Sequence, residues 1–576
     1  FAAVNVLEPL YEACLDRMKA FMLEWSQAQK VPHPNYYKDF AAVIARVEKH
    51  ANEKYFIFKS IIIRNLYGVD IMDEAVEICK LRLFLKLAAQ LEPDYAQDNL
   101  GIEPLPDIDF NVRAGNTLVG FATEKQAEDV IRQDLLGYNT VWPEVQKEAQ
   151  EIAEMFALFR QQQTELGGAV SVSDKKSLRA KLAPLEDRLN AYLADTYGVT
   201  AKKAIKDWVH SHKPFHWFIE FYEIMAKGGF NVIIGNPPYL DMRQLTGYRI
   251  VGYRTLDTKN LYSLVLERCT HLTHGRMGYI VPISSTSTEG YLTLQEILRP
   301  QDMWFASFDD RPAHLFDGLD KNTLSILLLS STEHPAQITS SRLNRWAAEE
   351  RPALFALIQN HQTPKSQLIG SLPRIGSSVE DSIWSKLFAT GQRVSKAFTE
   401  HGDTVYYSRK VNAFLQVLDF VPEVRDGKGK KRPPSEFKEL TFATQARSAA
   451  IFCLFNSTLF RWFIDVVSDG SHLNRRETDN FPFDPSKAET LSDDFRRLAT
   501  KLAKDLVSHS FTRTMTYTHD TLTVQCIVPK HSKPIIDEID RALAKHYGFT
   551  DEELDFIINY DIKYRMGRDG GEEESL

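Results

Sequence analysis

The spacing of apolar positions divides the first part of the chain into helices and strands. Apolar residues recur every three or four positions in residues 4–22 and 40–47, which predicts helices up to about residue 64. Residues 66–71 are predicted to form a strand, residues 74–89 a helix and residues 109–113 the next strand. The apolar side of the 74–89 helix is expected to consist of Ala75, Ile78, Leu81, Leu85 and Ala88.

The middle of the chain has a different pattern. Residues 124–213 are helical in pattern and rich in charge, with the clearest helices at 145–160 and 177–193. Pro184 is expected to interrupt the second of these helices, because proline lacks the backbone N–H. No heptad pattern is sustained, so we interpret the region as a helical insertion rather than a coiled coil.

Strand patterns return after the insertion. Short apolar runs between turn residues predict strands at 230–234, 276–282, 304–308 and 324–329. The last two are expected to form the final pair of a sheet, and the composition changes after residue 333. A chain of 576 residues is too long for one core. We therefore expect five segments, namely 1–123, 124–215, 216–332, 333–490 and 491–576.

The most specific chemistry lies where the strand at 230–234 runs into Asn236-Pro237-Pro238-Tyr239. This places Asn236 at the carboxyl end of a strand, where open α/β sheets bind ligands. An amino group on an aromatic ring is a poor nucleophile, and two acceptors that hold its hydrogens make it more reactive. The Asn236 side-chain oxygen and the Pro237 carbonyl are candidate acceptors, both prolines fix the backbone, and Tyr239 offers a stacking face. An ordinary strand-to-loop turn is the alternative reading, since Asn-Pro often starts turns.

This turn resembles motif IV of the amino-methyltransferases, and the order of the strands that follow resembles gamma-class adenine-specific DNA methyltransferases. The resemblance implies that a methyl group moves from S-adenosyl-L-methionine to the exocyclic amino group of adenine in double-stranded DNA. It assigns the catalytic role to Asn236, Pro237, Pro238 and Tyr239. The implied fold is α/β, with a Rossmann-like class I S-adenosylmethionine-dependent methyltransferase sheet, an insertion at 124–215, an α+β target-recognition domain at 333–490 and a helical tail.

One part of the family pattern has no counterpart in the chain. The glycine-rich loop after the first strand, which wraps the methionine end of the cofactor in this family, is missing. The chain opens at Phe1, without methionine and already in a helix-like pattern. We therefore expect a longer parent protein that supplies the first strand and this loop, and we expect the 576-residue chain alone to be inactive.

Three residues, which follow or end two of the predicted strands, are candidates for holding the cofactor. Asp70 and Ile71 end the predicted strand at 66–71, and an acidic residue at the end of the second strand of such a sheet accepts hydrogen bonds from ribose hydroxyls. The alternative for Asp70 is a favourable charge at a helix N-terminus. The resemblance also implies that Asn116, after the strand at 109–113, contacts the cofactor adenine. An asparagine in a glycine-containing turn is the alternative.

A second aromatic residue is a candidate for holding the target base. The resemblance places a stacking aromatic in the loop 313–318, where Phe316 is the matching position. A base in duplex DNA must be turned out of the stack before an enzyme can reach its amino group, and Tyr239 and Phe316 would then enclose it. A core phenylalanine at the end of a strand is the alternative for Phe316.

Basic residues in the last part of the chain are candidates for contacting DNA. The net charge is −8, so a DNA-binding surface must be a local patch. The candidate residues, from the basic run 425–434 and from 468–476, are Lys428, Lys430, Lys431, Arg432, Arg475 and Arg476. The second stretch resembles the target-recognition domains of large fused type IIG restriction–modification methylases and phage-defence methylases. Nuclease or other defence-system subunits are therefore candidate partners, although a solvated loop would look the same as the basic run.

Composition indicates the cellular environment in which the protein is expected to work. The five cysteines lie far apart without metal-ligand spacing, which predicts a reduced, cytoplasmic protein with neither disulfides nor a metal site. No apolar run is as long as a membrane span, so no membrane partner is expected. Two alternatives remain open: a protein-glutamine or rRNA methyltransferase that uses the same turn, and a non-catalytic DNA-recognition module.

Overall fold

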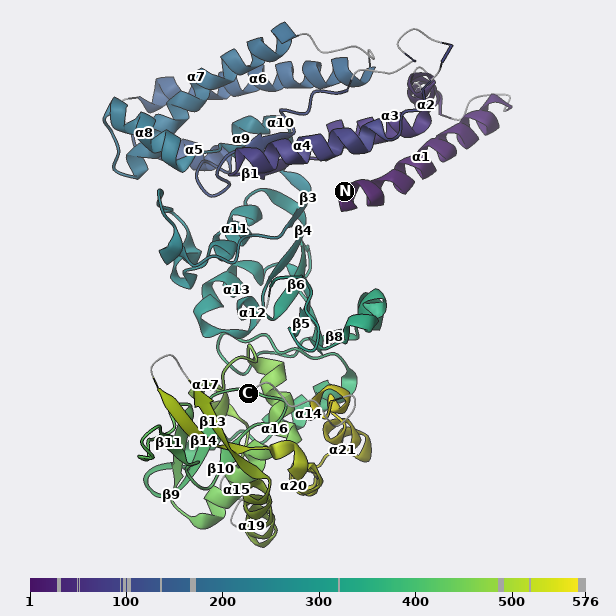
Figure 1. Ribbon diagram of the computed structural model, residues 1–576. Coiled ribbons are helices and arrows are strands. Elements are labelled where there is room, and N and C mark those ends of the chain that lie inside the picture. The colour runs from purple at the N-terminus through teal and green to yellow at the C-terminus, as the bar shows by residue number, and fades with distance from the viewer. Residues whose placement is uncertain are drawn as a thin grey trace. The chain divides into compact units, whose positions relative to one another are not determined.

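The computed structural model describes residues 1–567 except 28–32, 49, 51, 94, 97–99, 101–104, 135–136, 166–171, 320–321, 485–491 and 517–519. The described chain forms two compact units (Figure 1). The first unit contains residues 1–231, 241–253 and 264–274, and the second contains residues 232–240, 254–263 and 275–576. The boundary expected at residue 490 lies outside the described residues.

Helices dominate the first unit, and they include the long pair expected for the insertion (Figure 1). Its elements are α1 (Ala2–Ser26), α2 (Pro34–Val47), α3 (Glu53–Asn65), β1 (Gly68–Asp70), α4 (Asp73–Ala88), β2 (Val112–Ala114), α5 (Glu124–Ile131), α6 (Tyr138–Glu165), α7 (Val172–Thr196), α8 (Lys202–His212), α9 (Trp217–Glu220), α10 (Tyr222–Met225) and the short 3₁₀ helix η2 (Met242–Gln244). Helix α7 continues through Pro184, so the predicted interruption is wrong.

Three elements, β3 (Phe230–Gly235), α11 (Leu261–Thr270) and β4 (Thr273–Pro282), cross from one unit to the other. The second unit continues with η3 (Arg254–Thr258), α12 (Ser284–Ser287), η4 (Glu289–Tyr291), α13 (Leu292–Leu298), β5 (Asp302–Phe308), β6 (Leu324–Ser330), β7 (Ile338–Asn344), η5 (Ala348–Leu357) and β8 (Asn360–Gln362). Its C-terminal part contains α14 (Ser378–Phe388), η6 (Val394–Ala397), β9 (Phe398–Ser408), β10 (Val417–Leu418), β11 (Val424–Asp426), β12 (Phe437–Phe442), α15 (Gln445–Asn456), α16 (Thr458–Val467), α17 (Arg475–Asn480), α19 (Ser492–Ser508), β13 (Ser510–Thr516), β14 (Thr521–Ile527), η7 (Pro529–Ser532), α20 (Lys533–Tyr547), α21 (Asp551–Ile558) and α22 (Ile562–Arg565).

Helix α4 forms where it was predicted, but it buries a different face. Ile78, Leu81 and Leu85 are 57%, 57% and 61% exposed. Val76, Leu83 and Leu87 are buried instead, in a core that also takes residues from α1 and α3. The helical period was read correctly, whereas the buried side depends on neighbouring helices that periodicity does not reveal.

The sheet in the second unit has the strand order β3-β4-β6-β5-β7-β8. The predicted strands at 230–234, 276–282, 304–308 and 324–329 are all present. However, β7 and β8 continue the same sheet, so β5 and β6 are not its final pair and the boundary expected at residue 333 falls inside it. Strand β3 lies at one edge, with Val232 and Ile234 58% and 66% exposed.

Strands β1 and β2 pair in parallel as a separate two-stranded sheet. The prediction of a mixed α/β fold is confirmed, but the described residues do not form one continuous parallel sheet.

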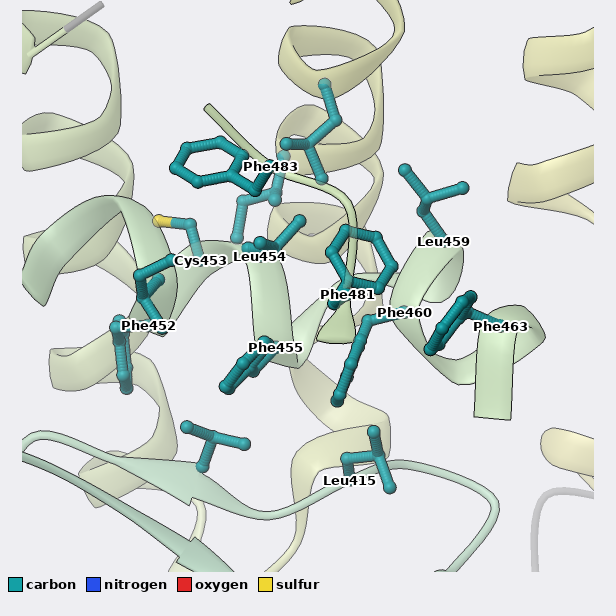
Figure 2. Packing of buried hydrophobic residues seen from close by; sticks show 14 of the residues in the cluster. Leu415, Phe452, Cys453, Leu454, Phe455, Leu459, Phe460, Phe463, Phe481 and Phe483 are labelled. Carbon is teal, nitrogen blue, oxygen red and sulfur yellow. The ribbon is translucent and has the colours of Figure 1, made fainter. Parts of the chain in front are cut away.

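The largest core lies in the C-terminal part, around α15 and α16 (Figure 2). Phe455 and Phe460 stack there with ring centroids 4.3 Å apart, and Phe481 packs edge-on against Phe460. No single helix in the described ranges is long and apolar enough to cross a membrane, although α15 and α16 pass that test as a pair bent by 64°. Both helices are almost wholly buried within this core.

Candidate active site

The Asn236 turn lies directly after the exposed edge strand β3. Asn236 is exposed, Pro237 is buried and Pro238 is exposed. Because Gly235 ends the strand and neither proline can donate to a neighbouring strand, the ladder stops at this point. The polar turn predicted from the sequence is therefore presented at the carboxyl end of β3.

The Tyr239 hydroxyl lies between two acceptors. It is 2.7 Å from Oδ1 of Asn236 and 2.9 Å from the carbonyl oxygen of Ile280 in β4. A phenol carries one hydrogen, so it can donate fully to only one of these oxygens at a time. Burial raises the pKa of Tyr239 to about 12, which keeps the hydroxyl protonated at neutral pH. Tyr239 thus orients Asn236, and it can turn to Ile280 when Asn236 accepts a hydrogen from another group.

Two further tyrosines, Tyr262 and Tyr291, pack in series against Tyr239, and neither was among the candidates named from the sequence. The Tyr239 ring meets the Tyr262 ring edge-on at 6.3 Å and 89°, and Tyr262 stacks on Tyr291 at 5.5 Å and 7°. The Tyr262 hydroxyl is 3.1 Å from that of Ser284, and burial raises its pKa well above the usual value. Nothing in the local sequence marks these residues, because the contacts join positions that are more than 20 residues apart.

Phe316 is 36% exposed in the loop between β5 and β6. The preceding residue, Leu315, packs against a cluster formed by Ala306, Phe308, Trp346 and Leu354. Core packing is thus supplied by Leu315 while Phe316 keeps part of its ring in solvent. This arrangement leaves the Phe316 ring able to contact a planar ligand.

In the first unit, the three candidate cofactor residues lie at or just after the ends of the parallel strands β1 and β2. Asp70 ends β1 and pairs in register with Ala114 at the end of β2. Its Oδ1 accepts from the backbone N–H of Met72 at 2.8 Å, and the exposed carboxylate retains capacity for further donors. Ile71, at 36% exposure, adjoins it.

Asn116 lies in the turn after β2 and is only 3% exposed. Its Oδ1 accepts from the backbone N–H of Leu118 at 3.0 Å. Within the described residues, the amide nitrogen of Asn116 has no hydrogen-bond partner at normal distance and angle. The Tyr248 hydroxyl lies close to the Asn116 side chain. A buried donor of this kind suits an acceptor nitrogen of an adenine ring. The turn is tightly packed, since a Cβ on Gly115 would lie 2.6 Å from the Phe215 ring.

The basic run in the second unit forms a turn after β11. Lys428 and Lys430 are exposed there, and their backbone N–H groups donate to Asp426. Lys431 and Arg432 are exposed too, but they pair with carboxylates, Lys431 with Glu423 and Arg432 with Asp426 and Asp520. Lys428 and Lys430 are therefore the better candidates for phosphate contact.

The other two candidate arginines differ from each other. Arg475 is 56% exposed, pairs with Asp479 and lies over the Phe398 ring at 4.7 Å. Arg476 is 19% exposed and pairs with Glu477. Its guanidinium also donates to the carbonyl oxygens of Ser287, Ile369 and Val467. The guanidinium of Arg476 is thus occupied by contacts within the protein, which makes it a weaker candidate for binding DNA than the exposed lysines.

No group of three or more His, Cys, Asp or Glu side chains is placed to hold a metal ion anywhere in the part of the chain that the structure describes.

Residues 64–301 match the family described as Eco57I restriction-modification methylase. This part of the chain is therefore similar to restriction–modification methylases. The matched range includes Asp70, Asn116 and the turn from Asn236 to Tyr239, whereas Phe316 and the C-terminal part lie beyond it. A similar protein is a putative type II restriction enzyme and methyltransferase, RM.MjaORFECS2P of Methanocaldococcus jannaschii, at 29% identity over 305 residues. That match spans 45% of this chain and 26% of the relative's length.

Similar solved structures are also restriction–modification enzymes. The type IIL enzyme MmeI in complex with DNA is 11% identical, with 96% of this chain and 98% of that chain covered and a TM-score of 0.31. The DNA-bound type ISP enzyme LlaBIII is 10% identical, with 89% and 50% covered and a TM-score of 0.27. TM-scores this low do not establish a shared fold.

Proposed function

We propose that the methylase domain transfers a methyl group from S-adenosyl-L-methionine to the exocyclic amino group of adenine at a specific site in double-stranded DNA. The observation that carries the proposal is the Asn236-Pro237-Pro238-Tyr239 turn, presented at the end of β3 within the range that matches restriction–modification methylases. The proposal places the reaction in restriction–modification or phage defence, inside the cell.

The residues of the turn would act on the amino group of a base that has left the duplex. Asn236 Oδ1 and the Pro237 carbonyl would accept its two hydrogens, which turns the nitrogen lone pair out of the ring system. The nitrogen would then take the methyl group from the sulfonium sulfur, which would leave as a neutral thioether, and the methylated amine would afterwards release a proton to solvent. During this step Tyr239 would transfer its hydrogen bond from Asn236 to Ile280, both within reach of its hydroxyl.

S-adenosyl-L-methionine would supply the methyl group, with its ribose held by the exposed carboxylate of Asp70 and its adenine beside Ile71 and Asn116. The fit rests on the shared edge of β1 and β2 and on the buried amide nitrogen of Asn116.

The test uses the natural full-length protein, called the parent protein from here on. Its recognition sequence is first read from the methylation pattern of DNA in cells that carry the parent gene. Asn236→Ala should abolish transfer of tritiated methyl to that DNA while DNA affinity is retained, because the lost acceptor acts mainly in the transition state. Asn231→Ala, an exposed position in the same strand, is the matched control. Labelling of protein or RNA but not of DNA would refute the proposal.

A further inference from the structure

Arg351 holds the loop that carries Phe316. Its guanidinium, in η5, donates to the carbonyl oxygens of His314 at 3.1 Å and of Leu315 at 2.8 Å. A planar guanidinium that bridges two successive carbonyls restricts the backbone more than a single contact does. The peptide groups immediately before Phe316 are therefore fixed from outside the loop.

Arg345 holds the start of the same loop. Its Nε donates to Asp309, the first residue after β5, at 2.7 Å. The two remaining nitrogens reach the C-terminal part: both donate to Asp465 of α16, at 3.0 and 3.1 Å, and Nη1 also donates to Asp561, the residue before α22. Burial opposes the charged form of Arg345, but the carboxylates outweigh it and hold its pKa well above the usual value.

Glu350, the residue before Arg351, is bound to helix α22. Glu350 accepts from the Lys563 ammonium and, at 3.0 Å, from the Tyr564 hydroxyl, and both donors belong to α22. A backbone hydrogen bond from Ala347, together with Lys563 and Tyr564, lowers the pKa of Glu350 to about 2, so it is ionised at neutral pH. Helix α22 thus contacts η5 on one side, and η5 contacts the Phe316 loop through Arg351.

We propose that α22 positions the Phe316 loop for capture of the target base, through Glu350 and Arg351, which act on the middle of the loop next to Phe316, and through Arg345, which acts at its start. The inference rests on the proposed function, since it takes Phe316 as the residue that stacks on the base. Arg345, Glu350, Arg351 and Lys563 are positioning residues, because none of them needs to touch the base. The C-terminal part would then contribute to base capture as well as to site recognition.

Lys563→Ala provides the decisive variant, because Lys563 is 48% exposed and its loss should not unfold the chain. Lys501→Ala is a close control: Lys501 is 47% exposed and pairs with Glu538 within the same unit, between α19 and α20. Both variants are measured in the parent protein on duplex DNA with 2-aminopurine at the target adenine. Lys563→Ala should lower the fluorescence increase and kcat at least twofold without changing the DNA affinity, whereas Lys501→Ala should match the wild type.

Arg351 supplies an independent comparison. Arg351→Met should lower the fluorescence increase at least as far as Lys563→Ala, and Arg351→Lys should restore part of it, since an ammonium can still donate to one of the two carbonyls. Thermal unfolding of each variant shows whether the chain remains folded at the assay temperature.

Phe316→Ala distinguishes failure of the inference from failure of the proposed function. If Phe316→Ala lowers the fluorescence increase but Lys563→Ala and Arg351→Met do not, the positioning role is refuted while the stacking role stands. If Phe316→Ala itself leaves fluorescence and methylation unchanged, the role assigned to Phe316 is wrong. If the parent methylates no DNA, the proposed function is wrong.

Discussion

Replacing Tyr239 with phenylalanine separates the two roles of this side chain. The ring and its edge-on contact with Tyr262 remain, whereas the hydroxyl that lies 2.7 Å from Asn236 and 2.9 Å from Ile280 is lost. One hydrogen bond contributes a net of about 0.5–1.5 kcal/mol, so we expect kcat for methyl transfer to fall roughly 2- to 12-fold. KM for DNA should change little, because the ring is still available for stacking.

Tyr239→Ala removes the ring as well. Stacking of a base on an aromatic side chain contributes about 1–3 kcal/mol, which predicts a further loss in kcat/KM of roughly 5- to 150-fold. The 2-aminopurine fluorescence increase should therefore fall in Tyr239→Ala and persist in Tyr239→Phe.

Single-turnover transfer of tritiated methyl, at saturating cofactor and DNA, measures the chemical step in all three proteins. Because the pKa of Tyr239 is raised to about 12, wild type and Tyr239→Phe should show the same pH profile around neutrality. A wild-type rate in Tyr239→Phe would refute the orienting role. If the fluorescence increase is as low in Tyr239→Phe as in Tyr239→Ala, the ring without its hydroxyl is not sufficient to stack on the base.

Three further predictions concern other parts of the chain. Asp70→Ala should weaken S-adenosylmethionine binding to the parent roughly 10- to 150-fold by calorimetry, as expected for lost hydrogen bonds to a charged group, and unchanged affinity would remove Asp70 from the site. Lys428→Ala and Lys430→Ala should each reduce the log–log salt slope of DNA binding by about 0.9, and an unchanged slope would exclude a phosphate contact. Burial raises the pKa of Asp540 to about 6 from the ordinary 3.8, so its contribution to stability is present below the ordinary value and is lost as the pH rises through the folded value. In the wild type, the free energy of unfolding should therefore fall by roughly 3 kcal/mol as the pH rises from the ordinary pKa of Asp540 to its raised pKa, and Asp540→Asn should remove this fall. Denaturant unfolding at a series of pH values measures it, and an unchanged fall in the variant would show that other groups cause it.

The sequence identified the candidate catalytic turn because its chemistry is concentrated in four consecutive residues after an apolar run. It could not identify Tyr262 and Tyr291, or the ties from Arg345 to Asp465 and Asp561, because these contacts join residues far apart in the chain and carry no local pattern. The buried face of α4 was misread for a related reason: a helix with apolar residues on several sides is oriented by its neighbours.

The continuation of the sheet through β7 and β8 has a consequence for exchanging sequence specificity between related enzymes. A graft of residues 333–490, the segment first expected to act as a module, would carry Arg345 and Asp465 but take Asp309 and Asp561 from the host. Arg345 has a side chain only 10% exposed, so a host that lacks either partner carboxylate would leave charge poorly compensated in the interior. Specificity should therefore be inherited in one piece from β5 to α22, and chimaeras joined within that stretch should fold poorly even when both parents are stable.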